Sequence, residues 1–307
     1  MGRYVARRLL LTIPVLLGAS FLIFAMVYAL PGDPIRALSG DRPLSEAVLA
    51  QLRKEFNLGD PFLVQYGKYL GGLAVGDFGT DFQGRSVWDL MVQRIPVTAK
   101  LALVAVVFEM VIGVIAGVLA GIRRNGFLDN LVLVSTTLVV SVPILVLAFL
   151  AQYTFGLRLG WFPIAGIQEG WYSYLLPGLV LASGSTAYVA RLTRTSMAEN
   201  LRADYVRTAR AKGLTPNTVV VRHTLRNSLI PVVTYIGADV GTLMGGAIVT
   251  ETVFNIPGIG RAVYDAIRAQ EGAVVVGVAM LLVLVFIFFN LVVDLLYAVL
   301  DPRIRYD

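Results

Sequence analysis

Residues 273–293 read AVVVGVAMLLVLVFIFFNLVV, an apolar stretch that contains no charged side chain. A helix of about 20 apolar residues can cross the hydrocarbon core of a bilayer, so this stretch predicts a transmembrane helix. Five more stretches of similar length carry at most one acidic residue each: 9–32, 101–122, 131–157, 170–190 and 227–249. A soluble helical core could contain one such stretch but not six. The sequence therefore predicts an all-α integral membrane protein with six transmembrane helices.

The composition of the whole chain also favours a bilayer. Of its 307 residues, 57% are hydrophobic and 15% are charged, whereas soluble domains contain roughly 45–50% apolar and about 25% charged residues. The first apolar stretch follows Arg3, Arg7 and Arg8, so a cleaved secretory signal ending near residues 27–29 is an alternative. The apolar part of a signal is only about 7–15 residues long, and the greater length here favours a span.

Missing residue types and motifs exclude several functions. The chain has no cysteine and one histidine, His223, which excludes thiol chemistry and disulfides and argues against a zinc site. No phosphate-binding loop is present, because the one Gly-Lys pair, Gly67-Lys68, is followed by Tyr69. We therefore expect no catalytic, cofactor-binding or metal-binding residue in this chain, and no nucleic-acid partner.

The distribution of Lys and Arg predicts the orientation, because short cytoplasmic loops carry more of them than external loops do. With the N-terminus in the cytoplasm, the inner segments hold 15 Lys and Arg and the short outer loops hold three. Residues near Asp41 and Asp81 are then external. The expected layout is a cytoplasmic N-terminus at 1–8, spans at 9–30, 99–122, 128–155, 172–190, 228–250 and 273–297, an external segment at 31–98, a cytoplasmic loop at 191–226, an external loop at 251–272 and a cytoplasmic C-terminus at 298–307.

The external segment 31–98 contains acidic and basic residues in similar number, together with turn signals such as PGDP at 31–34 and Gly71-Gly72. This composition is typical of a small folded cap. The segment is either an ordered connector or a docking surface for a soluble partner.

The cytoplasmic loop 191–226 holds eight basic and two acidic residues. Within it, DYVRTARAK at 204–212 predicts a short helix, and Gly213 stands where a left-handed C-terminal cap is expected. Thr215 and Pro216 are typical of the N-cap and the first position of a second helix. Small residues near the turn, Ala209 and Ala211 among them, would let another protein approach closely. A simpler alternative is that the basic residues only set orientation and attract anionic lipid.

Residues 207–213, RTARAKG, fit the frame E-A-A-x-x-x-G of permease subunits in bacterial ABC importers. The wider stretch DYVRTARAKGLTPNTVVVRHTLRNSLIP at 204–231 resembles the B-type permease of dipeptide, oligopeptide and nickel importers. Other stretches carry the same resemblance: LPGDP at 30–34, GDFG at 76–79, ETVFNIPGIG at 251–260 and DPR at 301–303. Two departures are Arg207 in place of the glutamate and Thr208 in place of the first alanine. Asp204 is the nearby acid that could substitute for that glutamate.

This resemblance implies a non-catalytic permease in the bacterial inner membrane that works with a second permease, two ATPase subunits and a soluble substrate-binding protein. The ATPase subunits use ATP and Mg, and this chain binds neither. Short peptides are the implied substrates, with nickel chelates, glutathione-like molecules and haem as alternatives. The residues expected to couple to the ATPase are Asp204, Tyr205, Arg207, Thr208, Ala209, Arg210, Lys212, Gly213 and Leu214.

Three acidic residues lie within predicted spans: Glu109, Asp239 and Asp294. Ionisable residues at membrane depth are costly and usually functional. One hypothesis is a secondary transporter or channel that uses Glu109 and Asp239 as a proton or cation relay. The other is that each acid is hydrogen-bonded between helices or lines a watery cavity.

The end of the fifth span contains a proline and two glycines within NIPGIG at 255–260, which argues against regular helix there. We expect this segment to line the external mouth and to contact the binding protein or the ligand, unless it is an ordinary loop. The residues concerned are Phe254, Asn255, Ile256, Pro257 and Gly258.

Overall fold

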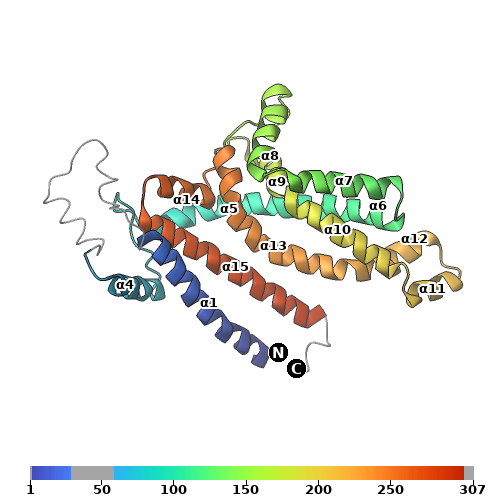
Figure 1. The fold of residues 1–307 in the computed structure, drawn as a ribbon, viewed down its shortest axis with the longest axis horizontal. Helices are drawn as coiled ribbons and strands as arrows, with labels where there is room; N and C mark the ends of the chain where they lie inside the picture. The colour runs from blue at the N-terminus through green and yellow to red at the C-terminus, as the bar shows by residue number, and fades with distance from the viewer. Residues whose placement is uncertain (1, 29–58, 301–307) are drawn as a thin grey trace. The chain divides into compact units, whose positions relative to one another are not determined.

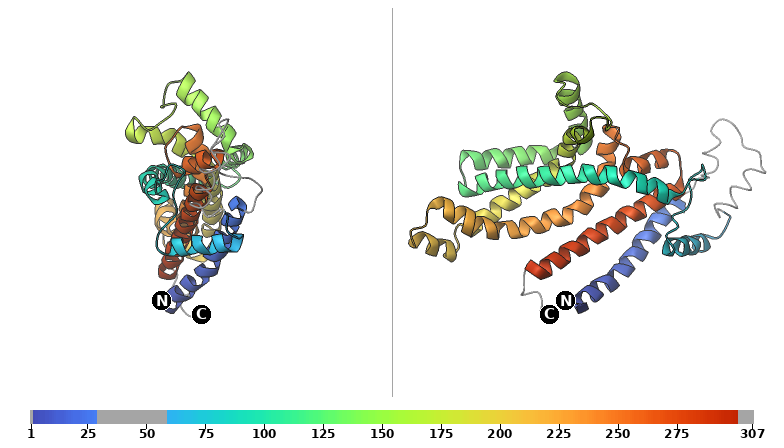
Figure 2. Two further views of the ribbon diagram at one scale, coloured as in Figure 1. Left: turned by 90° about the vertical axis from the view of Figure 1, so that its left-hand side faces the viewer. Right: turned by 180° about the vertical axis from the view of Figure 1, so that it is seen from behind.

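The computed structural model describes residues 2–28 and 59–300 (Figures 1 and 2). Within these ranges the chain is helical, with one isolated antiparallel bridge between Thr80 and Ser86. The first half of the predicted external segment, with Asp41 and the stretch 30–34, lies outside the described residues. So do the DPR stretch at 301–303 and the side chain of Asp294. The all-α fold class is confirmed for the part of the chain that is described.

The chain divides into two compact units, Met1–Thr98 with Pro257–Ile287, and Ala99–Ile256 with Phe288–Asp307. Unit 1 contains all or most of α1 (Gly2–Tyr28), α4 (Phe62–Ala74), the first half of α5 (Val87–Phe108), α14 (Ile259–Arg268) and most of α15 (Gly272–Leu300). Its core is apolar and includes Phe78, Val87, Met91, Val263 and Val278. The Oγ1 of Thr98 accepts a 2.8 Å hydrogen bond from the N–H of Ile259, which fixes the start of α14.

The described part of the predicted external segment contains α4, whose residues are not buried. Aromatic rings join α4 to α1: Phe24 lies 5.4 Å from Tyr69, and Phe21 lies 5.3 Å from Tyr66, between ring centroids. Beyond α4, the buried Asp81 carboxylate accepts hydrogen bonds from the backbone N–H groups of Gln83 and Arg85. Residues 59–98 therefore contain α4, a turn region with one isolated bridge, and the first half of α5.

Unit 2 holds the rest of α5 and the helices that follow it. In chain order these are a π-helical turn Glu109–Gly113, α6 (Val114–Ile122), α7 (Phe127–Ser141), α8 (Ile144–Ala151), a π-helical turn Gln152–Arg158, a 3-10 turn Gly170–Tyr174, α9 (Leu175–Leu181), α10 (Ser183–Asn200), α11 (Asp204–Ala211), α12 (Pro216–Thr218), a π-helical turn Val219–Leu225 and α13 (Arg226–Val253). The helices α6, α7 and α10 run side by side in Figures 1 and 2.

Glycines explain how closely α10 packs on the helix formed by the π-helical turn and α6. A Cβ atom at Gly113 would lie 2.7 Å from Cγ1 of Val189, and one at Gly121 would lie 2.6 Å from Cβ of Met197. Only a residue without a side chain fits at such distances, and small residues permit this close approach between membrane helices.

Among the residues that the structure describes, four helices are long and apolar enough to cross a membrane: Leu10–Tyr28, Val87–Ile122, Pro216–Val253 and Gly272–Val293. The third and fourth predicted spans are each broken, at 102° between Phe127–Ser141 and Ile144–Arg158 and at 61° between Gly170–Leu181 and Ser183–Asn200. Six spans result if each bent pair counts as one. The first break follows from Pro143, because the residue before a proline is forced out of the helical region, and Val142 has φ −98° and ψ 126°.

The helices also run further than the predicted spans. The second begins at Val87 rather than at residue 99, and the fifth is continuous from Pro216 rather than from residue 228. Charged residues at the end of an apolar stretch mark where a span leaves the hydrocarbon, but they do not end a helix. A helix ends where a cap or a proline satisfies or interrupts its backbone hydrogen bonds.

Candidate functional site

The short helix α11 is closed by the glycine cap that the sequence predicts. The N–H of Gly213 donates to the carbonyl of Arg210 at 2.9 Å, and the N–H of Leu214 donates to the carbonyl of Ala209 at 3.3 Å. This pair of bonds defines a Schellman motif, in which the capping residue adopts a left-handed conformation. Gly213 has φ +76°, so the predicted glycine cap is confirmed.

The second predicted helix also begins as expected. The Thr215 hydroxyl oxygen accepts a 3.4 Å hydrogen bond from the N–H of Thr218, and Pro216 occupies the first turn. The helix then continues without interruption through Val219–Leu225 into α13. The segment α12, the π-helical turn and α13 thus form one continuous helix.

One face of α11 packs inward. Val206 and Ala209 are buried against Val219. The expectation that Ala209 offers a close approach to another protein is therefore wrong, because its methyl group stabilises the helix pair from within. The other predicted coupling residues are exposed: Asp204, Tyr205, Arg207, Thr208, Arg210, Lys212, Gly213 and Leu214.

The exposed face is basic and only weakly tied to the rest of the chain. Arg207 lies 3.4 Å from Asp204, but both side chains are more than three-quarters exposed, and such pairs contribute at most about 1 kcal/mol. Asp204 is thus a weak substitute for the family glutamate. The Tyr205 hydroxyl donates to Oδ1 of Asn200 at 2.5 Å and so connects α11 to the end of α10.

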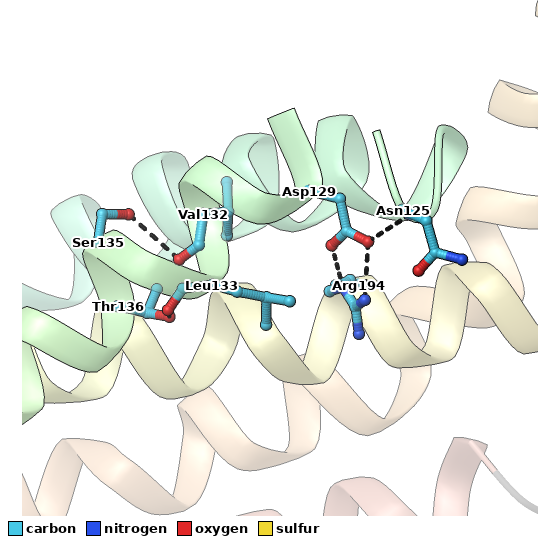
Figure 3. Close-up of polar contacts among 7 residues, drawn as sticks. All are labelled: Asn125, Asp129, Val132, Leu133, Ser135, Thr136 and Arg194. Carbon is cyan, nitrogen blue, oxygen red and sulfur yellow. Dashed lines mark hydrogen bonds and ion pairs between the residues drawn. The ribbon is translucent and has the colours of Figure 1, made fainter. Parts of the chain in front are cut away.

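A buried ion pair joins α7 to α10 near this region (Figure 3). Nη2 of Arg194 donates to Oδ2 of Asp129 at 2.8 Å, and Nε donates to Oδ1. The N–H of Asn125 donates to the same carboxylate at 2.7 Å. The Asp129 side chain is 1% exposed, so this bidentate contact is shielded from water. Sequence reasoning missed the pair, because nothing local shows that two residues 65 positions apart meet.

The predicted external mouth is partly buried. Helix α13 ends in a second Schellman motif, in which the N–H of Ile256 donates to the carbonyl of Glu251 at 2.8 Å and Asn255 has φ +53°. Phe254, Ile256 and Gly258 are buried, so these three cannot contact a soluble protein in this conformation, and that part of the expectation is wrong. Asn255 and Pro257 are exposed. The region 251–272 is also more than a loop, since it contains α14.

The two membrane-depth acids occupy the interior of unit 2. Glu109 is the first residue of a π-helical turn, a feature that occurs frequently at functional sites. It is fully buried, and neither carboxylate oxygen has a hydrogen-bond partner. Asp239 on α13 is 6% exposed, interacts with Ser185 and has no partner for Oδ2. Of the two alternatives for a structural acid, a hydrogen bond between helices is not formed by Glu109.

A cavity of about 340 Å³ lies where the two broken spans meet α13. Its walls are mostly apolar, with a polar strip from the start of α10 and from Thr242. The lining residues are Val139, Val140, Val142, Pro143, Ile144, Leu147, Leu181, Ser183, Gly184, Ser185, Thr242, Leu243 and Gly246. Sequence reasoning did not find this cavity, although Pro143 and the small polar run at 183–185 were available as signals of a helix break.

The sequence profile described as binding-protein-dependent transport system inner membrane component matches residues 113–306. A second profile, for the N-terminal part of such membrane components, matches residues 1–102. The chain belongs to this family of transport permeases. The resemblance drawn from the loop at 204–231 is confirmed.

Individual relatives of this permease agree. A dipeptide transport system permease from Alkalihalophilus pseudofirmus is 37% identical, and a glutathione transport system permease from Escherichia coli (strain K12) is 40% identical. A probable peptide ABC transporter permease from Sinorhizobium fredii is 37% identical. Each alignment covers 100% of this chain and of the relative.

The family assigns a role to this chain. The permease is a multi-pass inner membrane protein and the non-catalytic component of a transport system.

Proposed function

We propose that this permease is one of two related membrane subunits of an ATP-driven importer of short peptides. A soluble binding protein delivers the peptide from outside, and two ATPase subunits act on the cytoplasmic side. The exposed face of α11 is the observation that carries this proposal. Helix α11 ends in a glycine cap, carries basic residues on this face and is followed by the continuous helix that contains α13. The chain has no phosphate-binding loop of its own.

The mechanism follows from how α11 is held. Its buried residues anchor it to the π-helical turn at Val219–Leu225, while its outer face is free of buried ion pairs among the described residues. Closure of the ATPase subunits on ATP would move α11 as a rigid body. Because α12 continues into α13 and Tyr205 bonds the end of α10, that movement would reach two walls of the cavity. Such a change belongs to the rigid-body class of transport transitions.

The substrate class rests on the relatives and on the size of the cavity. The relatives are named for dipeptides, glutathione and peptides. A cavity of about 340 Å³ falls at the lower end of the range of roughly 300–1,000 Å³ that is typical of small-molecule sites. Peptides of two or three residues fit this size better than longer ones.

The proposed orientation places both termini and the loop around Lys212 in the cytoplasm, and Asp81 outside. The chain has no cysteine, so single cysteines can be labelled one at a time in whole cells. Asp81 itself is buried, whereas Gln83 is exposed, so Gln83→Cys is the suitable outer probe. Labelling of Gln83→Cys only after permeabilisation would contradict this orientation.

The transport proposal is tested in proteoliposomes that contain the permease, its partner permease, the ATPase subunits and the binding protein. We expect uptake of radiolabelled Ala-Ala to require ATP on the side that carries α11 and to continue when a protonophore collapses the proton gradient. Uptake that needs a proton gradient and no ATPase subunit would instead support the relay hypothesis for Glu109 and Asp239.

A further inference from the structure

We propose that the cavity at the two helix breaks binds the charged ends of a zwitterionic peptide, with Asp239 receiving the ammonium group and the first turn of α10 receiving the carboxylate. This inference rests on the proposed import of short peptides and assigns a binding site within the permease itself.

One end of the proposed site is the break between α9 and α10. The N–H of Ala182 donates to the carbonyl of Gly178 at 2.9 Å, and the N–H of Thr186 donates to the carbonyl of Ala182 at 2.7 Å. Between these two bonds the chain bends by 61° and α10 begins at Ser183. The first N–H groups of a helix have no acceptor within that helix, and the helix dipole makes this end partly positive.

Ser183, Gly184 and Ser185 form this first turn, and all three line the cavity. Gly184 has no atom within 4 Å of the position where a Cβ would stand, so the backbone there is open to an approaching ligand. A carboxylate is the group that a helix N-terminus attracts. The start of α10 would attract any anion, and the buried Asp239 on the facing helix α13 narrows the choice of ligand.

Asp239 is 6% exposed, and its Oδ2 has no hydrogen-bond partner. Its contact Ser185 lines the cavity, as do Thr242 and Leu243, which follow it by three and four residues on α13. Residues at these spacings lie on one face of a helix, so Asp239 stands one turn along from the cavity wall. An unpaired buried carboxylate costs several kcal/mol in desolvation, which a bound cation would offset.

The other groups around Asp239 also favour a cation. Glu109 approaches it closely enough to interact electrostatically and, like Asp239, forms no ion pair with any residue that the structure describes. Tyr235, one turn before Asp239 on α13, stacks on Tyr188 with 4.3 Å between ring centroids. Aromatic faces attract ammonium groups. Glu109 and Tyr235 thus lie near Asp239, to which we assign the ammonium group.

The two ends together select a zwitterion. A simple anion would be attracted by the start of α10 and repelled by Asp239 and Glu109. A simple cation would be attracted by the two acids and repelled by the start of α10. Apolar walls from Val139, Val142 and Leu147 would accept different side chains between the two ends. This arrangement suits a short peptide whose termini are constant and whose side chains vary.

The test measures binding of radiolabelled Ala-Ala to the detergent-purified complex of both permeases and the ATPase subunits, without the binding protein. We expect Asp239→Asn to weaken binding by about tenfold or more, which corresponds to about 1.4 kcal/mol. N-acetyl-Ala-Ala should bind the native complex more weakly by a similar factor. It should bind the Asp239→Asn complex about as well as Ala-Ala does, because the variant has already lost the ammonium contact. Ala-Ala amide should also bind the native complex more weakly.

The matched control is Thr234→Val, which changes a partly exposed residue of the same helix whose hydroxyl donates to the carbonyl of Ile230. Its affinity for Ala-Ala should stay unchanged. If Asp239→Asn is poorly folded, the comparison of Ala-Ala with N-acetyl-Ala-Ala on the native complex still decides. Equal binding of those two peptides, or no binding of Ala-Ala to the native complex, would overturn this site. Continued ATP-driven uptake in that case would leave the proposed function standing, and loss of both would remove it.

Discussion

The helix α11 and the cavity at the helix breaks are both part of unit 2, and they are stabilised in opposite ways. Helix α11 is exposed, and local bonds at Gly213 and Thr215 determine where it ends and where the next helix starts. The cavity is lined by three segments that are distant in sequence. Both carboxylate oxygens of the buried Glu109 and Oδ2 of the buried Asp239 have no hydrogen-bond partner. The proposed surface for a partner subunit is thus built from short-range signals, whereas the proposed ligand site depends on tertiary contacts.

The largest expected effect concerns the ion pair that joins α7 to α10. Asp129→Asn leaves the Arg194 guanidinium largely buried without its counter-charge, and breaking a buried pair costs about 3–5 kcal/mol. Thermal unfolding of the detergent-purified chain should show this loss. Arg202→Gln, an exposed change near the end of the same helix, should have little effect. A stability loss of similar size in both variants would show that the Asp129–Arg194 ion pair contributes no more to stability than an exposed residue does.

A second prediction tests the close packing between α10 and the π-helical turn Glu109–Gly113. Gly113→Ala places a Cβ 2.7 Å from Val189 Cγ1, and such overpacking costs about 1–3 kcal/mol. Gly245→Ala is the matched control, because a Cβ there meets no atom within 4 Å. In an open helical position alanine is the better helix former by roughly 0.5–1 kcal/mol. Unfolding of the two variants should therefore shift in opposite directions, and equal shifts would contradict the packing described here.

The smallest expected effect concerns Thr215, the N-cap residue of α12, which follows the exposed helix α11. Thr215→Ala removes the side-chain cap of α12, which is worth about 0.5–2 kcal/mol in general. The 3.4 Å bond to Thr218 places the expected loss at the lower end of that range. Thr215→Ser retains the hydroxyl and should keep most of the stability. Hydrogen exchange of the amides at 217–219 measures this local change, and equal protection in the alanine and native chains would show that the cap contributes nothing.

The difference between the two regions also explains what the sequence could predict. The helix at 204–211, its glycine cap and the restart at Thr215 were all predicted, because caps are encoded by residues within one turn of each other. Glu109 and Asp239 were recognised as unusual, since acids within apolar stretches stand out without any knowledge of the fold. Their positions relative to each other and to the cavity needed tertiary structure.

Two errors have a common cause. Ala209 was expected on a contact surface because it is a small residue near the turn that follows α11. Ile256 was expected on one because the proline and glycines around it argue against regular helix there. Both are buried, since within such a segment the inward residues hold it in place and their neighbours face outward. Sequence position can identify a segment, but the exposed side of that segment depends on the element packed beneath it. The exposed Asn255 is therefore a better position for a cross-linker to the binding protein than Ile256.

The central claim is that α11 receives energy from a separate ATPase, and a pair of substitutions at Gly213 tests it most directly. A Cβ at Gly213 meets no atom of this chain within 4 Å, so the cost of a side chain comes from φ +76° and from any partner surface. Asparagine tolerates this conformation and a β-branched residue does not. We predict that Gly213→Val inserts normally but loses ATP-driven Ala-Ala uptake in the reconstituted complex, while Gly213→Asn retains most of it. Full uptake by the valine variant, with the ATPase subunits still bound, would contradict the claim.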